Sequence, residues 1–325
     1  MRLKIIKAGL LDTVQDGGRY GFQHLGINPG GAMDRFAARL ANALLGKELE
    51  APVIEMHYPA PQILFQKHAI ICLTGADFRP LLNGESVSLN QPVAVKGNAL
   101  LSFEGRRRGA RCYLSVLNEW QLQPWLNSFS TNLKAAVGGC DGRRLQKGDE
   151  LVFAPLSFLM EKDFCLLPWK YHEPVDDTNE ICFLVGPEWG WLTTKGQTDL
   201  QNELFSITPA SDRMGYRLQG EALEQERKEQ LVSSAVNFGT VQLLPTGQLV
   251  VLMADHQTTG GYPRVANVIS VHLPKLAQMN AGAEIKLVMT TMEEAEEKAL
   301  VQKDYLLRLQ NTCKLKIENW LQQHA

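Results

Sequence analysis

Polar side chains that can form hydrogen bonds gather in two glycine-rich stretches that lie far apart in the chain. The first covers residues 13–19 and continues at Gly30 and Gly31, and the second covers residues 257–262. Glycine lets a backbone turn with positive φ or approach a ligand closely, so such clusters are typical of tight turns and binding loops. We therefore expect the two stretches to form parts of one site.

The residues expected to bind a substrate carry amide, hydroxyl or charged groups, or are glycines that permit close approach. They are Gln15, Asp16, Arg19, Gly30, Gly31, Gln257, Thr258, Thr259, Gly260 and Gly261. Such groups recognise polar ligands by hydrogen bonds. Two roles stay open for Asp16 and Arg19: they pair with each other or with the backbone, or they hold a polar substrate.

The catalytic candidates are Asp212, Arg213 and Tyr262. An arginine presents a planar fork of donors that suits a carboxylate or phosphate, but the same fork commonly locks a loop by pairing with an aspartate. The neighbouring Asp255 and His256 offer a general base, although adjacent residues on a strand point to opposite faces, so at most one enters a site. The cysteines and histidines are scattered, and we expect no metal site.

Asp34 follows Gly30 and Gly31 and precedes an apolar pattern that predicts a helix ending near Gly46. Its carboxylate is suited to cap that helix. The alternative is an anion-binding loop at the helix start, against which the negative charge of Asp34 itself argues. Capping is the preferred interpretation, and it leaves the glycine amides as functional candidates.

The elements that must position these residues are mostly strands, because short apolar or alternating runs recur between Gly, Pro, Asn and Asp. The strands are expected at 62–65, 69–74, 86–95, 99–103, 110–116, 181–185, 241–244, 248–253, 265–271 and 284–289. Asn83 and Gly84 predict a hairpin, since both tolerate the positive φ of a type I′ turn. A short helix is expected near Pro274. The fold class is therefore mainly β with few helices.

The chain from Met292 onward changes to the pattern of a long amphipathic helix. Acidic residues fill its first turn, and apolar residues then follow at helical spacing up to Trp320. Packing against the chain's own barrel and docking onto a partner subunit both remain open for this helix.

Composition restricts the classes of partner. The 325 residues include 33 basic and 35 acidic ones, for a net charge of -2, so no overall field favours nucleic acid or an anionic membrane. The run Arg106–Arg107–Arg108 is the only dense basic spot and is interpreted as a solvated loop. The N-terminus lacks the apolar core of a signal peptide, and we expect a cytoplasmic protein.

Four motifs together carry a family resemblance that extends over most of residues 1–290. They are TVQDGGRYG (13–21), GGAMD (30–34), SDRMGYRL (211–218) and QTTGGYP (257–263). The chain resembles the family called allophanate hydrolase subunit 2, or biotin-dependent carboxyltransferase, and among its members is most like the C subunit of bacterial 5-oxoprolinase. The resemblance implies two cyclophilin-like β-barrel lobes that form a cleft. We accordingly expect an N-terminal lobe over 1–175, a C-terminal lobe over 176–290 and a C-terminal helix over 291–325.

The resemblance implies three functions. The first is a subunit of an ATP-dependent 5-oxoprolinase that acts with subunits A and B, shares ATP with them, and opens 5-oxo-L-proline to L-glutamate. The second is the carboxyltransferase component of a biotin-dependent urea carboxylase, and the third is a regulatory binder like the Kip antagonist. The chain carries no phosphate loop, dinucleotide-binding turn or nucleophile elbow, so we expect no activity of the chain alone. We expect the first function, because the sequence shows no biotin carboxylase or biotin carrier segment.

Two segments depart from the family pattern. Residues 117–120 read Leu-Asn-Glu-Trp where relatives commonly have Gly-Gly-Ile, and residues 127–131 read Asn-Ser-Phe-Ser-Thr where a Gly-Ser-Arg-Ser-Thr-like stretch is common. The second segment lacks the arginine, which argues against a phosphate or carboxylate contact there.

Overall fold

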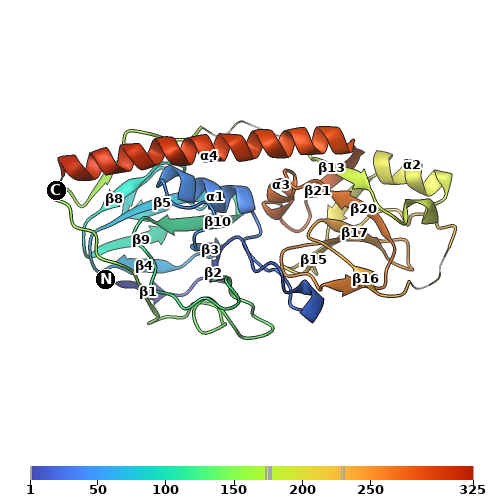
Figure 1. Ribbon diagram of the computed structural model, residues 1–325, viewed down its shortest axis with the longest axis horizontal. Helices are drawn as coiled ribbons and strands as arrows, with labels where there is room; N and C mark the ends of the chain where they lie inside the picture. The colour runs from blue at the N-terminus through green and yellow to red at the C-terminus, as the bar shows by residue number, and fades with distance from the viewer. Residues whose placement is uncertain (1, 173, 175–177, 228, 230, 325) are drawn as a thin grey trace. The chain divides into compact units, whose positions relative to one another are not determined.

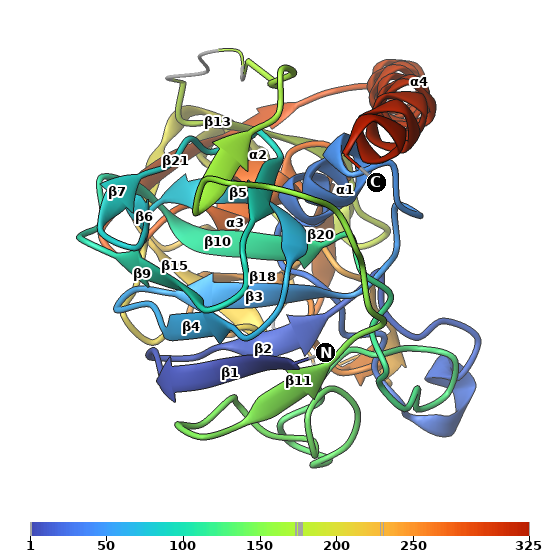
Figure 2. The ribbon, with the colours of Figure 1, turned by 90° about the vertical axis from the view of Figure 1, so that its left-hand side faces the viewer.

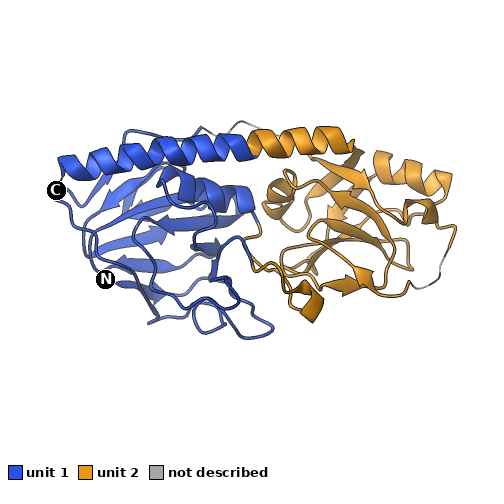
Figure 3. Ribbon diagram, viewed as in Figure 1, with its two compact units in different colours: residues 1–18, 34–174, 303–325 blue, residues 19–33, 175–302 orange. Residues whose placement is uncertain are grey.

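The computed structural model describes residues 2–324 except 173, 175–177, 228 and 230 (Figure 1). The chain divides into two compact units, coloured in Figure 3. Unit 1 comprises residues 1–18, 34–174 and 303–325, and unit 2 comprises residues 19–33 and 175–302. Residues 19–33 thus belong with the second half of the chain, and helix α4 (Met292–Gln323) is shared between the units.

Unit 1 is built from two six-stranded sheets (Figure 2). The first has the order β11 (Glu150–Val152), β1 (Arg2–Lys7), β4 (Gln62–Phe65), β9 (Ala99–Phe103), β6 (Pro80–Leu82) and β7 (Glu85–Ser86). The second has the order β12 (Phe164–Leu166), β8 (Val93–Val95), β5 (Ala69–Asp77), β10 (Arg108–Val116), β3 (Val53–His57) and β2 (Thr13–Gln15). Alternate strand residues such as Leu3, Ile63 and Leu114 are fully buried and form one core.

Unit 2 is a closed barrel of seven strands. Its order is β13 (Glu180–Val185), β20 (Arg264–Val268), β17 (Thr240–Leu243), β18 (Leu249–Leu252), β15 (Gly215–Gln219), β14 (Leu204–Ile207) and β21 (Glu284–Met289). Strands β16 (Ser234–Ala235) and β19 (Thr259–Gly260) form a separate pair. Closure removes the sheet edges, and the core inside the barrel includes Ile181, Phe183 and Val251.

Helix α1 (Arg35–Leu44) begins as expected at Asp34, whose carboxylate accepts the backbone N–H of Ala37 at 2.8 Å. It covers the sheet that contains β5 and β10, as Figure 2 shows. Gly46 follows with φ of 65°, and a Cβ there would lie 2.4 Å from the Cα of Lys314 in α4. Glycine is therefore required both for the turn and for the close approach of α4.

The remaining helices are η1 (Gln23–Leu25), η2 (Trp189–Trp191), α2 (Thr194–Asn202) and α3 (Leu273–Ala277). The part of α4 in unit 1 packs in cis: Leu306, Cys313, Ile317 and Trp320 join a core with residues of α1 and the sheet, including Leu40 and Ile70. Packing on the chain's own fold is thus confirmed for this part of the helix. Within the described residues, no helix has the length and apolar character needed to cross a bilayer.

The predicted fold class, mainly β with few helices and a C-terminal helix, is confirmed. Of the two β-barrel lobes that the resemblance implies, unit 2 is a closed barrel, whereas the strands of unit 1 form two six-stranded sheets. Asn83 and Gly84 form the expected hairpin turn with φ of 50° and 86°. The strand expected over 86–95 is wrong in its middle, because Asn90 has φ of 57° and only the two ends, Ser86 in β7 and Val93–Val95 in β8, pair as strands. At the expected boundary between the two lobes, residues 173 and 175–177 lie outside the described residues.

Candidate functional site

Arg213 lies at the centre of a loop cluster in unit 2. It precedes β15 and is 6% exposed. Its Nε and Nη2 donate to the two carboxylate oxygens of Asp255 at 2.8 and 3.0 Å, and Nη2 also donates to the carbonyl of Gly31 at 2.7 Å. The planar fork is therefore directed to a carboxylate of the protein itself, which is the structural alternative considered for this residue.

This cluster brings together segments that are distant in sequence. Gly30 and Gly31 have φ of 64° and 96°, conformations that favour glycine, and the carbonyl of Gly31 is turned toward Arg213. The side chain of Asn28 donates to the backbone carbonyl of Asp255 at 3.1 Å. Residues 19–33 are thus tied to Arg213 and to the loop after β18 by these two hydrogen bonds.

Asp212 is exposed and organises the turn into β15. One of its oxygens, Oδ1, accepts the backbone N–H groups of Met214 at 2.7 Å and Gly215 at 3.3 Å. Such a turn is typical of aspartate and explains the residue locally. Because the carboxylate is exposed, Asp212 also remains accessible to a ligand.

The stretch 257–262 forms an exposed ribbon. Strand β19 pairs with β16, Thr259 opposite Ala235 and Gly260 opposite Ser234. The side chains of Gln257, Thr259 and Tyr262 are exposed, that of Tyr262 by 40%. The hydroxyl of Thr259 is consequently presented on a paired backbone, and Gln257 and Tyr262 flank this pair.

The glycines of this ribbon have distinct surroundings. A Cβ on Gly260 would lie 2.4 Å from the amide nitrogen of Gln242, which is buried without a hydrogen-bond partner among the described residues. A Cβ on Gly261 would lie 3.2 Å from the carbonyl of Leu231, and the Gly261 carbonyl accepts the N–H of Leu231. Both glycines therefore allow the ribbon to pack closely against its neighbours. The backbone of Thr258 also holds the ribbon in place, because its carbonyl accepts the N–H of Val236.

Both residues considered as a general base bond to the protein itself. Asp255 holds Arg213, and the ring Nδ1 of His256 lies 2.5 Å from the carbonyl of Gln257, with His256 only 2% exposed.

Arg264 and Glu188 form a second ion pair in unit 2 that the sequence patterns did not reveal. Arg264 donates to both carboxylate oxygens of Glu188 at 2.9 and 2.8 Å, and to the carbonyl of Ala235 in β16 at 3.0 Å. The hydrogen bonds from Arg264 hold the pKa of Glu188 below its usual value. This pair anchors the strand on which the ribbon 257–262 rests.

In unit 1, Asp16 is buried and bound by four donors. They are the backbone N–H groups of Gly18 and Phe129 and the hydroxyls of Ser128 and Ser130. The segment 127–131, which departs from the family pattern, therefore supplies donors to Asp16. Gln15 beside it is also buried, and its amide donates to the hydroxyl of Thr13 at 3.0 Å.

Arg19, the third member of that stretch, belongs to unit 2. Its backbone N–H donates to the carbonyl of Pro29 at 2.7 Å, which closes the loop 19–29, and its side chain is buried. Asp16 thus bonds to the backbone, one of the alternatives left open for it, and also to two serine hydroxyls that the sequence did not indicate.

A buried polar chain in unit 1 was also missed. The backbone N–H of Asp34 donates to the hydroxyl of Tyr113, which donates to the carboxylate of Glu55, each at 2.8 Å. Burial, together with the charges of Glu55 and Asp34, raises the pKa of Tyr113, so its hydroxyl stays protonated and can donate. The one sequence signal was a lone glutamate inside the apolar run Val53–His57.

Comparisons with known proteins agree with this architecture. The family described as "Carboxyltransferase domain, subdomain A and B" matches residues 25–289. The chain is 37% identical to the C subunit of 5-oxoprolinase from Haemophilus influenzae over 283 residues, which cover 87% of this chain and 89% of that protein. It is 35% identical to the C subunit of 5-oxoprolinase from Escherichia coli over 309 residues, which cover 94% of this chain and 97% of that one.

A crystal structure of K. lactis urea amidolyase has the same fold, with a TM-score of 0.87 and 25% identity over 95% of this chain. The chain corresponds to only 20% of that longer protein. The sequence match, the two relatives and the shared fold all confirm the predicted resemblance. The chain therefore belongs to the family of carboxyltransferase domains composed of subdomains A and B.

Proposed function

We propose that this chain is the C subunit of an ATP-dependent 5-oxoprolinase that opens 5-oxo-L-proline to L-glutamate together with subunits A and B, in the cytoplasm. The observation that carries the proposal is the 35% identity to a protein named as the C subunit of 5-oxoprolinase, over 97% of that protein's length. The urea amidolyase match, by contrast, covers only a small part of a much longer chain.

The chemistry explains why such a reaction requires ATP. A lactam is a stable amide, and water attacks it slowly because the ring nitrogen is a poor leaving group. Transfer of the terminal phosphoryl group of ATP to the lactam oxygen activates the ring carbon for attack. Water then adds to that carbon, the C–N bond breaks to leave an acyl phosphate and a free amine, and a second water releases phosphate to give the carboxylate. We propose that ATP is shared between this chain and its partner subunits.

The residues of unit 2 divide into two roles within this proposal. Gln257, Thr259 and Tyr262 are exposed and carry donors for a polar substrate, and Asp212 offers an accessible carboxylate. Arg213 is a positioning residue, since it holds Asp255 and the Gly31 carbonyl in place. The glycines Gly30, Gly31, Gly260 and Gly261 permit the backbone geometry on which these side chains depend.

Reconstitution tests the proposal. The chain alone should not hydrolyse ATP in the presence of 5-oxoproline, whereas a mixture with cognate subunits A and B should do so and release glutamate. The matched control omits only this chain from the mixture. Full activity without it, or activity of the chain by itself, would contradict the assignment.

A carboxyltransferase role is the second candidate, because the fold is shared with urea amidolyase at a TM-score of 0.87. That role requires a biotin carried by another chain or domain. Addition of a biotin carrier, its carboxylase and labelled bicarbonate should leave urea unlabelled. Label on urea would reverse the order of the two candidates, and reconstituted 5-oxoprolinase with unlabelled urea would support the first.

A further inference from the structure

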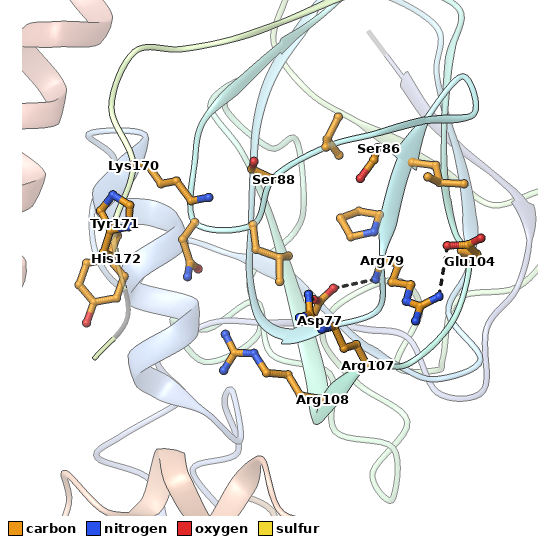
Figure 4. A pocket seen from close by; sticks show the side chains of 15 residues that line it. Asp77, Arg79, Ser86, Ser88, Glu104, Arg107, Arg108, Lys170, Tyr171 and His172 are labelled. Carbon is orange, nitrogen blue, oxygen red and sulfur yellow. Dashed lines mark hydrogen bonds and ion pairs between the residues drawn. The ribbon is translucent and has the colours of Figure 1, made fainter. Parts of the chain in front are cut away.

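A cavity of about 900 Å³ opens within unit 1 (Figure 4). Its lining comes from the bend between β5 and β6, from the start of β10 and from residues 170–172. The run Arg106–Arg107–Arg108, interpreted from sequence as a solvated loop, supplies two of the lining residues, Arg107 and Arg108. The cavity has the size of sites that hold small molecules.

Positive charge exceeds negative charge among the described residues that line this cavity. The cations are Arg79, Arg107, Arg108 and Lys170, and the carboxylates are Asp77 and Glu104. Nη1 of Arg107 lies 3.8 Å from Oδ2 of Asp77, and Nη1 of Arg79 lies 3.5 Å from Oε2 of Glu104. Each carboxylate therefore has an arginine beside it. The lining as a whole therefore carries a net positive charge, and a group of cations around one concave surface attracts anions.

Backbone conformation places part of this charge. Arg79 has φ of 53°, a left-handed conformation that is unfavourable for a residue with a Cβ. Its backbone N–H donates to the carboxylate of Asp77 at 2.9 Å, which holds the bend (Figure 4). The fold thus maintains an unfavourable conformation at a residue whose side chain lines the cavity.

Asn90 provides a second, independent observation. It lines the cavity, is 7% exposed and has φ of 57°. Its side-chain oxygen is buried and has no hydrogen-bond partner among the described residues. A buried acceptor without a donor is costly, and a ligand that carries a donor would relieve that cost.

We propose that this cavity binds a phosphorylated small molecule of nucleotide size. Arginine forks and a lysine ammonium are the groups that hold phosphate oxygens, and Ser86 and Ser88 add hydroxyl donors beside them. The volume exceeds the need of a single inorganic phosphate, and the unmatched acceptor on Asn90 favours a ligand that also has hydrogen-bond donors. The inference rests on unit 1 alone and does not depend on the proposed enzymatic function.

Calorimetric titration of the full chain with inorganic tripolyphosphate and with ATP tests the inference without any partner protein. Both should bind, more weakly as salt increases, because exposed charges are screened. Arg108→Ala and Lys170→Ala should each weaken binding by about tenfold to a hundredfold, the loss expected for one charge-assisted hydrogen bond. Circular dichroism should show that both variants stay folded.

Arg106→Ala is the matched control, because Arg106 belongs to the same run but does not line the cavity. It removes the same charge and should change the affinity by less than about twofold. If Arg106→Ala and Arg108→Ala weaken binding equally, the binding depends on the overall charge of the run and not on the cavity, and the inference is overturned. The inference would also be overturned if one or both of these ligands failed to bind at about 1 mM. Tighter binding of ATP than of tripolyphosphate would support a ligand of nucleotide size.

Discussion

The two units hold an aspartate carboxylate in different ways. In unit 1, Asp16 is surrounded by neutral donors, two backbone N–H groups and two serine hydroxyls. In unit 2, Asp255 is held by the guanidinium of Arg213 in a bidentate ion pair. Both arrangements satisfy the carboxylate, but only the second requires an opposite charge from a distant part of the chain.

This difference matters for interpreting charged residues in glycine-rich loops. Asp16 and Arg213 were both candidates for contact with a substrate, and both have hydrogen-bonding groups directed to the protein. The groups that remain accessible belong to other candidates in the same stretches, such as the exposed Tyr262 and Asp212. Positioning and contact are thus divided between different residues of the same stretches.

The largest effect is expected when one member of the ion pair is removed. Arg213→Met leaves the carboxylate of Asp255 largely buried without its partner, so the free energy of unfolding should fall by about 3–5 kcal/mol. Arg213→Lys keeps the charge but loses the fork and should cost about 1.5–3 kcal/mol. Urea denaturation of the full chain measures the free energy of unfolding of each variant. If Arg213 has a structural role, Arg213→Lys should lower stability, seen also as a lower melting temperature, by more than it lowers reconstituted activity.

The double variant Arg213→Met with Asp255→Leu is the control for that pair. It removes both charges together and should be less destabilised than Arg213→Met alone, because no unpaired charge stays largely buried. The single variant Asp255→Leu completes the set. If the free energy of unfolding lost by the double variant equals the sum of the losses of Arg213→Met and Asp255→Leu, the two residues are not coupled. The opposite charge of Arg213 would then not be what holds Asp255 in unit 2, and the contrast with the neutral donors around Asp16 in unit 1 would fail.

Asp16→Asn should produce the second largest effect. The substitution keeps the shape of the side chain but replaces one acceptor oxygen by an N–H donor, which must face a donor from Gly18, Ser128, Phe129 or Ser130. The free energy of unfolding should fall by about 2–3 kcal/mol, the cost of a charge-assisted hydrogen bond and an unmatched buried donor. Asp141→Asn is the matched control, since its side chain is 80% exposed, and it should change stability by less than about 0.5 kcal/mol.

Features with a local cause could be predicted from the sequence. The expected strands at 62–65, 99–103 and 284–289 have the bounds observed for β4, β9 and β21. Asp34 caps its helix, because a cap needs only residues three positions apart. The polar helix α2 was missed, since only Gly196 and Leu200 are buried in it and its apolar periodicity is weak.

Long-range pairing could not be predicted in the same way. The donors that Ser128 and Phe129 supply to Asp16 come from more than 110 residues later in the chain, and Asp255 lies 42 residues after Arg213. Nothing in the local pattern of either residue identifies its partner. The assignment of residues 19–33 to unit 2 has the same origin, because it depends on contacts such as the hydrogen bond between Gly31 and Arg213 rather than on chain order.

Asp212 offers the smallest and most selective test of the comparison. Like Asp16, it accepts the backbone N–H of the residue two positions later, but it is exposed and the turn uses only its Oδ1. Asp212→Asn keeps the acceptor of the turn, so stability should change by less than about 0.5 kcal/mol, whereas Asp212→Ala should cost about 1 kcal/mol.

Reconstituted 5-oxoproline-dependent ATP hydrolysis then separates structure from contact at this residue. If the charge of Asp212 acts on a substrate, Asp212→Asn should lower activity while its melting temperature stays that of the parent protein, and Asp212→Glu should restore part of the loss. Tyr262→Phe, which removes only an exposed hydroxyl, should lower activity in the same assay without loss of stability. Unchanged activity in both Asp212→Asn and Tyr262→Phe would exclude the exposed groups of unit 2 from the reaction, and the contrast between positioning and contact residues would then fail for this unit.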